Sequence, residues 1–160
     1  MTKGASGFTL LELLITASIS ALLLTLALPY ARTLFELQRL KNCVEVIAGD
    51  LSYIRTESIK QNSPLAVSFT TNGALLWTYT ATLFGTKSNA TFPTIQMTSV
   101  TFAGVPATVT FNPVRGTANA GQIILSTSDS SNQLRINVGI LGQISTCTLT
   151  ANSIGGYPKC

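Results

Sequence analysis

The sequence predicts an α+β protein in which one long N-terminal helix packs on an antiparallel β-sheet domain. Three observations support this prediction: an apolar run over residues 8–28, a helical amphipathic pattern after it, and alternating β-branched residues from about residue 64. We therefore expect four segments in the 160-residue chain: a leader (1–7), a hydrophobic helix (8–29), an amphipathic helix half (30–62) and a β-rich globular domain (63–160).

The apolar run, FTLLELLITASISALLLTLAL, contains a single charge, Glu12. As a helix its roughly 21 residues span about 31 Å, enough to cross the hydrocarbon core of a bilayer. Three interpretations compete. A cleaved secretory signal would be unusually long here, and LALPYA is a poor small-residue cleavage site. A plain anchor would leave a carboxylate in hydrocarbon at a cost of ~2.5 kcal/mol or more. We favour the third, in which another chain supplies a partner for Glu12.

The stretch Gly7-Phe8-Thr9-Leu10-Leu11-Glu12 resembles the class III signal of type IV pilins and type II secretion pseudopilins. This resemblance implies that a prepilin peptidase cleaves the Gly7/Phe8 bond and that Phe8 becomes N-methylated. It also implies that Glu12 pairs with the new α-amine of a neighbouring subunit, so that each charge is buried only when it is paired. Residues 8 and 12 are also helix neighbours, so pairing within one chain stays open. Pro29 lies where these helices commonly carry a helix-loosening proline.

The second half of the helix is amphipathic. Proline in a helix interior costs about 3 kcal/mol, so we expect a kink or a melted turn at Pro29. Beyond it, the apolar positions repeat at helical spacing, and Asn62-Ser63-Pro64 supplies the stop. These apolar positions are Leu34, Leu37, Leu40, Val44, Ile47, Leu51 and Ile54.

The C-terminal segment reads as short strands separated by turn residues, which predicts an antiparallel sheet packed on the helix. The candidate strands cover residues 65–70, 74–80, 94–102, 107–111, 122–126, 133–138 and 142–149.

The three cysteines, Cys43, Cys147 and Cys160, form no C-x-x-C pair, so no metal site is expected. In an exported domain, a disulfide between Cys147 and Cys160 would hold the C-terminal tail, and this is the pairing we expect. Connectivity cannot be deduced from sequence, so pairing of Cys43 with either of the other two stays open.

The composition argues against an enzyme. The chain has no histidine and six acidic residues, of which only Asp129 lies in the β-rich segment. Without histidine, neither a Ser-His-Asp nor a Cys-His arrangement can be built. We expect no catalytic residues and no cofactor.

A second resemblance narrows the family. FNPVRGTANAGQIILS (111–126) and NQLRINVGILGQISTC (132–147) are similar to the GspH/FimT-type domain of minor pilins and pseudopilins. This implies a type IV pilin fold and a minor pilin that enters a pilus filament and helps to initiate or cap it. A type II secretion pseudopilin of the same fold is the alternative.

The partners implied are other pilins or pseudopilins, met through N-terminal helices, the prepilin peptidase, an inner-membrane assembly platform and the membrane itself. The implied location is the bacterial inner membrane with the globular domain in the periplasm, then a surface pilus or a periplasmic pseudopilus.

Some members of this group receive DNA in natural transformation through a Gly-Arg-x-Arg motif. This chain has Gly142-Gln143-Ile144-Ser145 at that place, without either arginine, which argues against a DNA receptor. Scattered cations are the remaining candidate DNA contacts: Arg115, Arg135, Lys159 and, less directly, Lys87.

Overall fold

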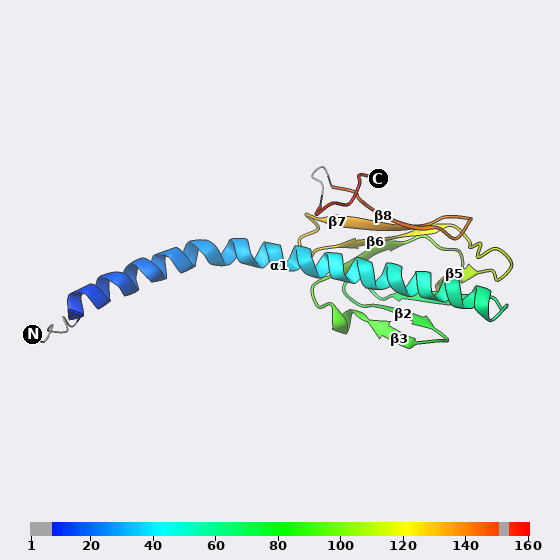
Figure 1. Cartoon of the computed structure of the whole chain (residues 1–160), viewed down its shortest axis with the longest axis horizontal. Helices are drawn as coiled ribbons and strands as arrows, with labels where there is room; N and C mark the ends of the chain where they lie inside the picture. The colour runs from blue at the N-terminus through cyan, green and yellow to red at the C-terminus, as the bar shows by residue number, and fades with distance from the viewer. Residues whose placement is uncertain (1–7, 151–153) are drawn as a thin grey trace, which may run out of the picture. The chain divides into compact units, whose positions relative to one another are not determined.

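The computed structural model describes residues 8–150 and 154–160, and Figure 1 shows the order of their elements. The chain divides into two compact units, one ending at Phe35 and one beginning at Glu36. The described elements are α1 (Leu10–Lys60), β1 (Leu65–Thr71), β2 (Trp77–Ala81), β3 (Gly85–Ser88), the 3-10 helix η1 (Asn89–Thr91), β4 (Gln96–Val100), β5 (Ala107–Phe111), β6 (Gly121–Ser126), β7 (Gln133–Val138) and β8 (Ile144–Thr148).

The predicted apolar stripe on the second half of the helix is confirmed from Leu40 onward. The apolar side chains that are at most 1% exposed recur at helical spacing, so one face of α1 is fully covered. They are Leu40, Cys43, Val44, Ile47, Leu51 and Ile54. The helix ends where predicted: Asn62 takes the left-handed conformation with φ 49° and Pro64 follows.

The β-rich unit contains two four-stranded sheets, both antiparallel. One has the order β3-β2-β1-β5 and the other β4-β6-β7-β8. Every predicted strand segment overlaps an observed strand, and the antiparallel α+β class is confirmed. The division into two sheets was not anticipated, because the alternation of side chains says which face is buried but not which strands pair.

One observed strand, β3, is absent from the prediction. Its sequence, Gly85-Thr86-Lys87-Ser88, is polar and lacks alternation, and it is held as an edge strand by pairing with β2. The strand predicted over 74–80 begins only at Trp77, because residues 73–76 form a turn in which the Leu76 N–H donates to the Gly73 carbonyl.

A single hydrophobic core joins α1 to both sheets. In Figure 1, residues 36–60 of α1 lie across the two sheets, and the stripe of α1 packs against their inward side chains. The largest of these inward side chains are Trp77, Phe111, Met97, Ile123, Leu125, Leu134 and Ile136, all buried. The indole of Trp77 donates a 2.9 Å hydrogen bond to the Ile95 carbonyl, so its polar atom is satisfied inside the core. The unit that begins at Glu36 therefore carries its own complete core.

Candidate functional site

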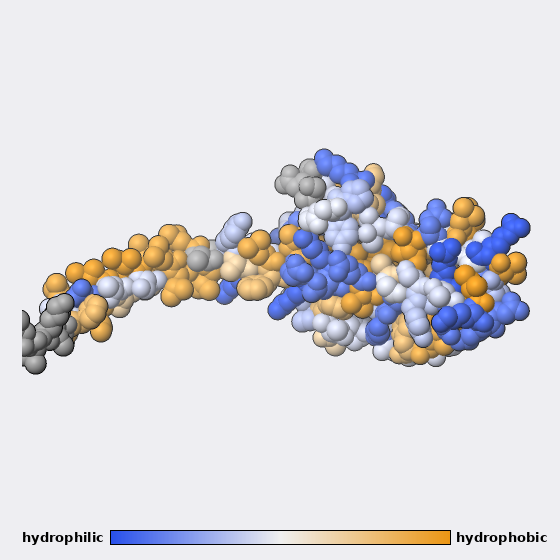
Figure 2. All heavy atoms as spheres, viewed as in Figure 1, coloured by the Kyte–Doolittle hydropathy of each residue, from blue (hydrophilic) through white to orange (hydrophobic). Residues whose placement is uncertain are grey.

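The first half of α1 presents an almost continuous apolar surface. Phe8 is 79% exposed, and large aliphatic side chains are exposed around the whole helix circumference. Figure 2 shows this stretch as mostly hydrophobic spheres. The exposed members are Leu10, Leu11, Leu13, Leu14, Ile15, Ile19, Leu22, Leu23, Leu24, Leu26 and Leu28. A helix that is apolar all round needs an apolar environment, which is either lipid or other helices.

The polar side chains of this stretch bind their own backbone. The hydroxyls of Thr16, Ser18, Ser20 and Thr25 donate to carbonyls three or four residues earlier, at 2.7–3.0 Å. Such hydroxyls need no water and are tolerated in hydrocarbon.

Glu12 lies in the first turn of α1 and is exposed. Its backbone N–H donates to the Thr9 hydroxyl at 3.2 Å, so Thr9 caps the helix. A carboxylate in the first turn also interacts favourably with the positive end of the helix dipole. Gly7, the other half of the expected cleavage site, lies outside the described residues. Position 29, where Pro29 stands, falls within α1, and the effect of this proline stays a prediction.

Judged by length and hydropathy, no single described helix qualifies as a membrane span. The stretches Leu10–Leu26 and Tyr30–Lys60 qualify only together, as a bent pair.

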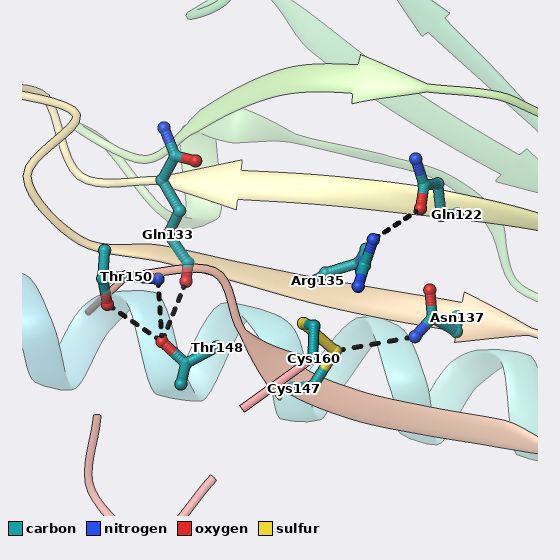
Figure 3. Close-up of a disulfide and its surroundings, with 8 residues drawn as sticks. All are labelled: Gln122, Gln133, Arg135, Asn137, Cys147, Thr148, Thr150 and Cys160. Carbon is teal, nitrogen blue, oxygen red and sulfur yellow. Dashed lines mark hydrogen bonds between the residues drawn. A yellow bond between two sulfur atoms is a disulfide. The ribbon is translucent and has the colours of Figure 1, made fainter. Parts of the chain in front are cut away.

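The C-terminal tail is tied to the edge strand β8. Figure 3 shows the disulfide between Cys147 and Cys160, the pairing expected from sequence. Cys43 is a buried free thiol. The tail also pairs with Thr148, whose N–H donates to the Pro158 carbonyl and whose carbonyl accepts from the Cys160 N–H. The tail thus covers one end of an edge strand.

The tail contacts α1 as well. The Tyr157 hydroxyl donates to Glu45 at 3.1 Å, and partial burial together with this carboxylate raises the pKa of Tyr157. The Lys41 side chain lies against Gly155, and φ +52° at Gly155 is a backbone conformation that favours glycine.

The candidate DNA-contacting cations do not form one patch. Arg115 lies in the loop after β5, beside the turn before β8, whereas Lys159 lies beside Thr148 at the other end of that strand. The two residues therefore lie beside opposite ends of β8, which is itself about 13 Å long. Arg135 lies half-buried on β7, where its guanidinium donates to Gln122 at 3.1 Å (Figure 3).

Lys87 is engaged in an ion pair that joins β3 to α1. Its ammonium lies 2.7 and 2.9 Å from the two carboxylate oxygens of Asp50, and the Tyr79 hydroxyl donates to the same carboxylate at 2.7 Å. Burial first, and then the Asp50 charge, raise the pKa of Tyr79 well above its ordinary value. Burial likewise raises the pKa of the Cys43 thiol to about 12, so this thiol stays protonated. The side chains of Lys87, Asp50 and Tyr79 therefore join the sheet to α1, and Cys43 packs in the core, so we assign all four a structural role.

Arg55 is a residue that sequence reasoning missed. From α1 it donates to the carbonyls of Gly116 and Leu141, at 3.1 and 3.3 Å, and so connects the loop after β5 to the turn after β7. The motif stretches 111–126 and 132–147 therefore meet at this arginine. The only signal in the sequence was a cation beside the apolar stripe, and such residues usually face water.

Asn119 was also missed. Its side-chain amide accepts from the Thr110 N–H at 2.6 Å and donates to the Thr108 carbonyl at 2.7 Å, so it occupies the outer edge of β5 as a strand residue would. Among the described residues, no group of three or more His, Cys, Asp or Glu side chains is placed to hold a metal ion.

Comparison with known proteins gives two family matches and one structural match. The family described as type II transport protein GspH matches residues 44–142, and the prokaryotic N-terminal methylation motif matches residues 2–28. The fold is similar to the crystal structure of the type IV minor pilin FimU of Pseudomonas aeruginosa, with a TM-score of 0.52 and 12% identity over 68% of this chain and 87% of that one. No curated protein sequence matches this chain. At that identity the structural likeness concerns the fold alone.

Proposed function

The chain belongs to the GspH family of pilin-like proteins, and from this we propose that it is a minor type IV pilin that enters a filament and helps to initiate or cap it. Proteins of these families are structural components. The observation that carries the proposal is the pairing of a self-sufficient globular unit with a helix that exposes apolar side chains on every side. Because the core is complete without that helix surface, the surface is available to neighbouring subunits.

Packing these helices together in a filament would bury the Glu12 carboxylate, which then needs a counter-ion. Cleavage between Gly7 and Phe8 would create an α-amine at Phe8, and Glu12 stands one helical turn away in sequence. In a bundle of apolar helices, the amine of one subunit and the Glu12 carboxylate of the next neutralise each other, and a subunit out of register leaves both charges unpaired. The proposed partners are therefore other pilins through this helix, the prepilin peptidase and the membrane assembly platform. The proposed location is the inner membrane, with the globular unit in the periplasm until assembly.

Two alternatives share this fold. A type II secretion pseudopilin would use the same helix and the same processing, and the family match fits it equally. A DNA receptor is the less favoured alternative, because Arg115 and Lys159 lie at different ends of β8 and Lys87 is paired with Asp50.

The test is mass spectrometry of the chain isolated from sheared surface filaments and from membranes. We expect the N-terminus to be N-methylated Phe8 in both fractions. A chain that begins at Met1 or near Tyr30, or that is absent from filaments although filaments form, would contradict the proposal. A processed chain found only in the envelope of secreting cells would favour the pseudopilin. A gel-shift assay at low salt tests the DNA receptor, since phosphate contacts weaken steeply with salt.

A further inference from the structure

A cluster of exposed apolar side chains lies at the end of the globular unit where α1 finishes. Val114 is 83% exposed, Ile140 70%, Leu141 68% and Ile59 48%. We call these four residues the α1-end patch. Figure 2 shows hydrophobic spheres between hydrophilic ones at this end of the domain. Clusters of this kind on a folded surface usually mark a site of interaction.

The patch residues come from three separate segments that lie against one another. A side chain at Gly116, two residues after Val114, would meet the Ile59 side chain at 2.9 Å, so this loop lies directly against α1. The Ala118 N–H donates to the Ile140 carbonyl at 3.0 Å, which ties the same loop to the turn after β7.

The patch is also held in place. Arg55 donates to the carbonyls of Gly116 and Leu141 and so connects both loops to α1. Gly142 has φ +72°, and a side chain there would overlap the Gly116 carbonyl oxygen, so the two backbones are in direct contact. Loops fixed before binding lose little conformational freedom when a partner arrives.

The rim of the patch is basic. Arg115 is exposed next to Val114, and the Arg55 guanidinium lies between the loops. The Lys60 ammonium is 3.4 Å from Glu57, so that pair adds no net charge. The other described carboxylates of this unit are engaged elsewhere: Glu36 with Ser128, Glu45 with Tyr157, Asp50 with Lys87 and Asp129 with Thr127.

We propose that the α1-end patch docks a second, non-identical pilin-like subunit whose facing surface presents leucine-type side chains among carboxylates. This proposal rests on the proposed function as a filament subunit. The apolar centre supplies contact area, and the arginine rim selects a partner of opposite charge.

The opposite end of the unit shows how this fold can present such a surface. Leu75 and Leu76 are exposed there, next to Ala74, whose carbonyl accepts a hydrogen bond from the Met97 N–H at the start of β4. The neighbouring Gln96 side chain donates to the Ser128 carbonyl, and the Ser128 hydroxyl donates to Glu36. That end therefore combines leucines with the carboxylates of Glu36 and Asp129.

Two other occupants fit less well. Arg39 follows Glu36 by about one turn of α1, and Lys41 lies beside Gly155 of the tail, so two cations offset the two carboxylates at that end. A second copy of this chain therefore offers no net charge complementary to the arginine rim. A membrane surface is usually held by aromatic side chains and by several cations, whereas the patch has no aromatic residue and its rim has two arginines, one of which is engaged with the Gly116 and Leu141 carbonyls.

The test uses the full chain in cells that assemble the filament. A photo-crosslinking residue replaces Ile140, and crosslinked products are identified and mapped by mass spectrometry. We expect a crosslink to a different pilin-like subunit, at an apolar residue flanked by carboxylates. Arg115→Glu and Val114→Asp should each lower its yield roughly tenfold or more, because each places negative charge against negative charge.

Val105→Asp is the matched control, since Val105 lies outside the patch and is even more exposed than Val114, and we expect it to leave the yield unchanged. Crosslinks only to lipid, only to a second copy or to no polypeptide would overturn the inference, as would equal yields from the Val114 and Val105 variants. Incorporation of the unsubstituted chain into sheared filaments is measured in the same cells. If the chain enters filaments normally but position 140 gives no crosslink to a different pilin-like subunit, only the docking surface is refuted. Absence of the chain from filaments refutes the proposed function.

Discussion

The hydroxyl oxygen of Thr9 accepts a 3.2 Å hydrogen bond from the backbone N–H of Glu12. Thr9 is therefore the N-cap of α1, and Glu12 is the third residue of its first turn. The pattern Thr-x-x-Glu is that of a capping box, in which the glutamate can also bind back to the cap residue. Glu12 thus has two candidate roles, one within its own helix and one as the counter-ion of a neighbouring subunit.

Substitutions at these two positions separate the roles. Glu12→Gln preserves a side chain suited to the capping box and removes the charge, whereas Thr9→Ala removes the cap, at a local cost of about 1 kcal/mol, and preserves the charge. If charge pairing drives assembly, Glu12→Gln and Glu12→Ala should both be absent from sheared filaments, and Thr9→Ala should enter them. An immunoblot of filament and membrane fractions measures this. Normal entry of Glu12→Gln would leave capping as the role of Glu12.

Processing depends on the residue before the cleaved bond. Gly7→Leu should leave an uncleaved precursor in the membrane, because the resemblance to the class III signal places the cut between Gly7 and Phe8. The mass of the intact chain gives the result directly. A shortened Gly7→Leu product that begins at Phe8 would show that the peptidase does not need this glycine.

The disulfide should contribute measurably to stability. Cys160→Ser opens a loop of 13 residues between Cys147 and Cys160 and should lower the free energy of unfolding by about 2–5 kcal/mol. Denaturant unfolding under oxidising conditions measures the difference. A reductant should destabilise the unsubstituted chain by a similar amount and leave the Cys160→Ser variant unchanged. Equal stability of the two chains without reductant would argue against any contribution of the disulfide.

Because the pKa of Tyr79 is raised in the folded chain, we expect the protein to lose stability at alkaline pH. With this raised pKa, the folded chain holds the phenolic proton more tightly than the unfolded chain does. The stability from this group is complete below about pH 10, where the unfolded tyrosine is protonated, and falls by about 1.4 kcal/mol per pH unit above it. Cys43 adds a slope of the same sign between 9.0 and about 12.

Tyr79→Phe should therefore flatten the dependence of unfolding free energy on pH above 10. Tyr53→Phe, at an exposed position on α1, is the matched control and should preserve the slope. The measurement is denaturant unfolding between pH 8 and pH 11.5. An unchanged slope in Tyr79→Phe would mean that its phenol ionises as readily in the folded chain as in the unfolded one.

Gly142 should tolerate no side chain. Gly142 and Gly73 both have positive φ, +72° and +104°, which costs any other residue about 1–3 kcal/mol. Gly142→Ala should destabilise by clearly more than Gly73→Ala, because a Cβ at 142 overlaps the Gly116 carbonyl whereas Gly73 has nothing within 4 Å. Thermal unfolding of the two variants measures the difference. Equal destabilisation by the two substitutions would mean that the loop containing Gly116 can move away from a Cβ at position 142 without loss of stability.

Features set by neighbours along the chain could be predicted from the residues alone. The repeat from Leu40 to Ile54 identified the buried face of α1, and the turn residues at Asn62-Ser63-Pro64 marked its end. The alternating segments located the remaining strands but not β3, which is polar and is held by its pairing with β2. The expected pairing of Cys147 with Cys160 is observed, although two other pairings had stayed open.

Local periodicity and short motifs thus established the long helix, its apolar first half, the strand-rich remainder and the family resemblance, because each depends on residues a few positions apart. The two-sheet arrangement, the role of Arg55 and the patch at the end of α1 emerge from folding in three dimensions. Arg55 reaches carbonyls 61 and 86 residues away in sequence. Contacts over such distances follow from how the whole core packs, and no local pattern of residues encodes them.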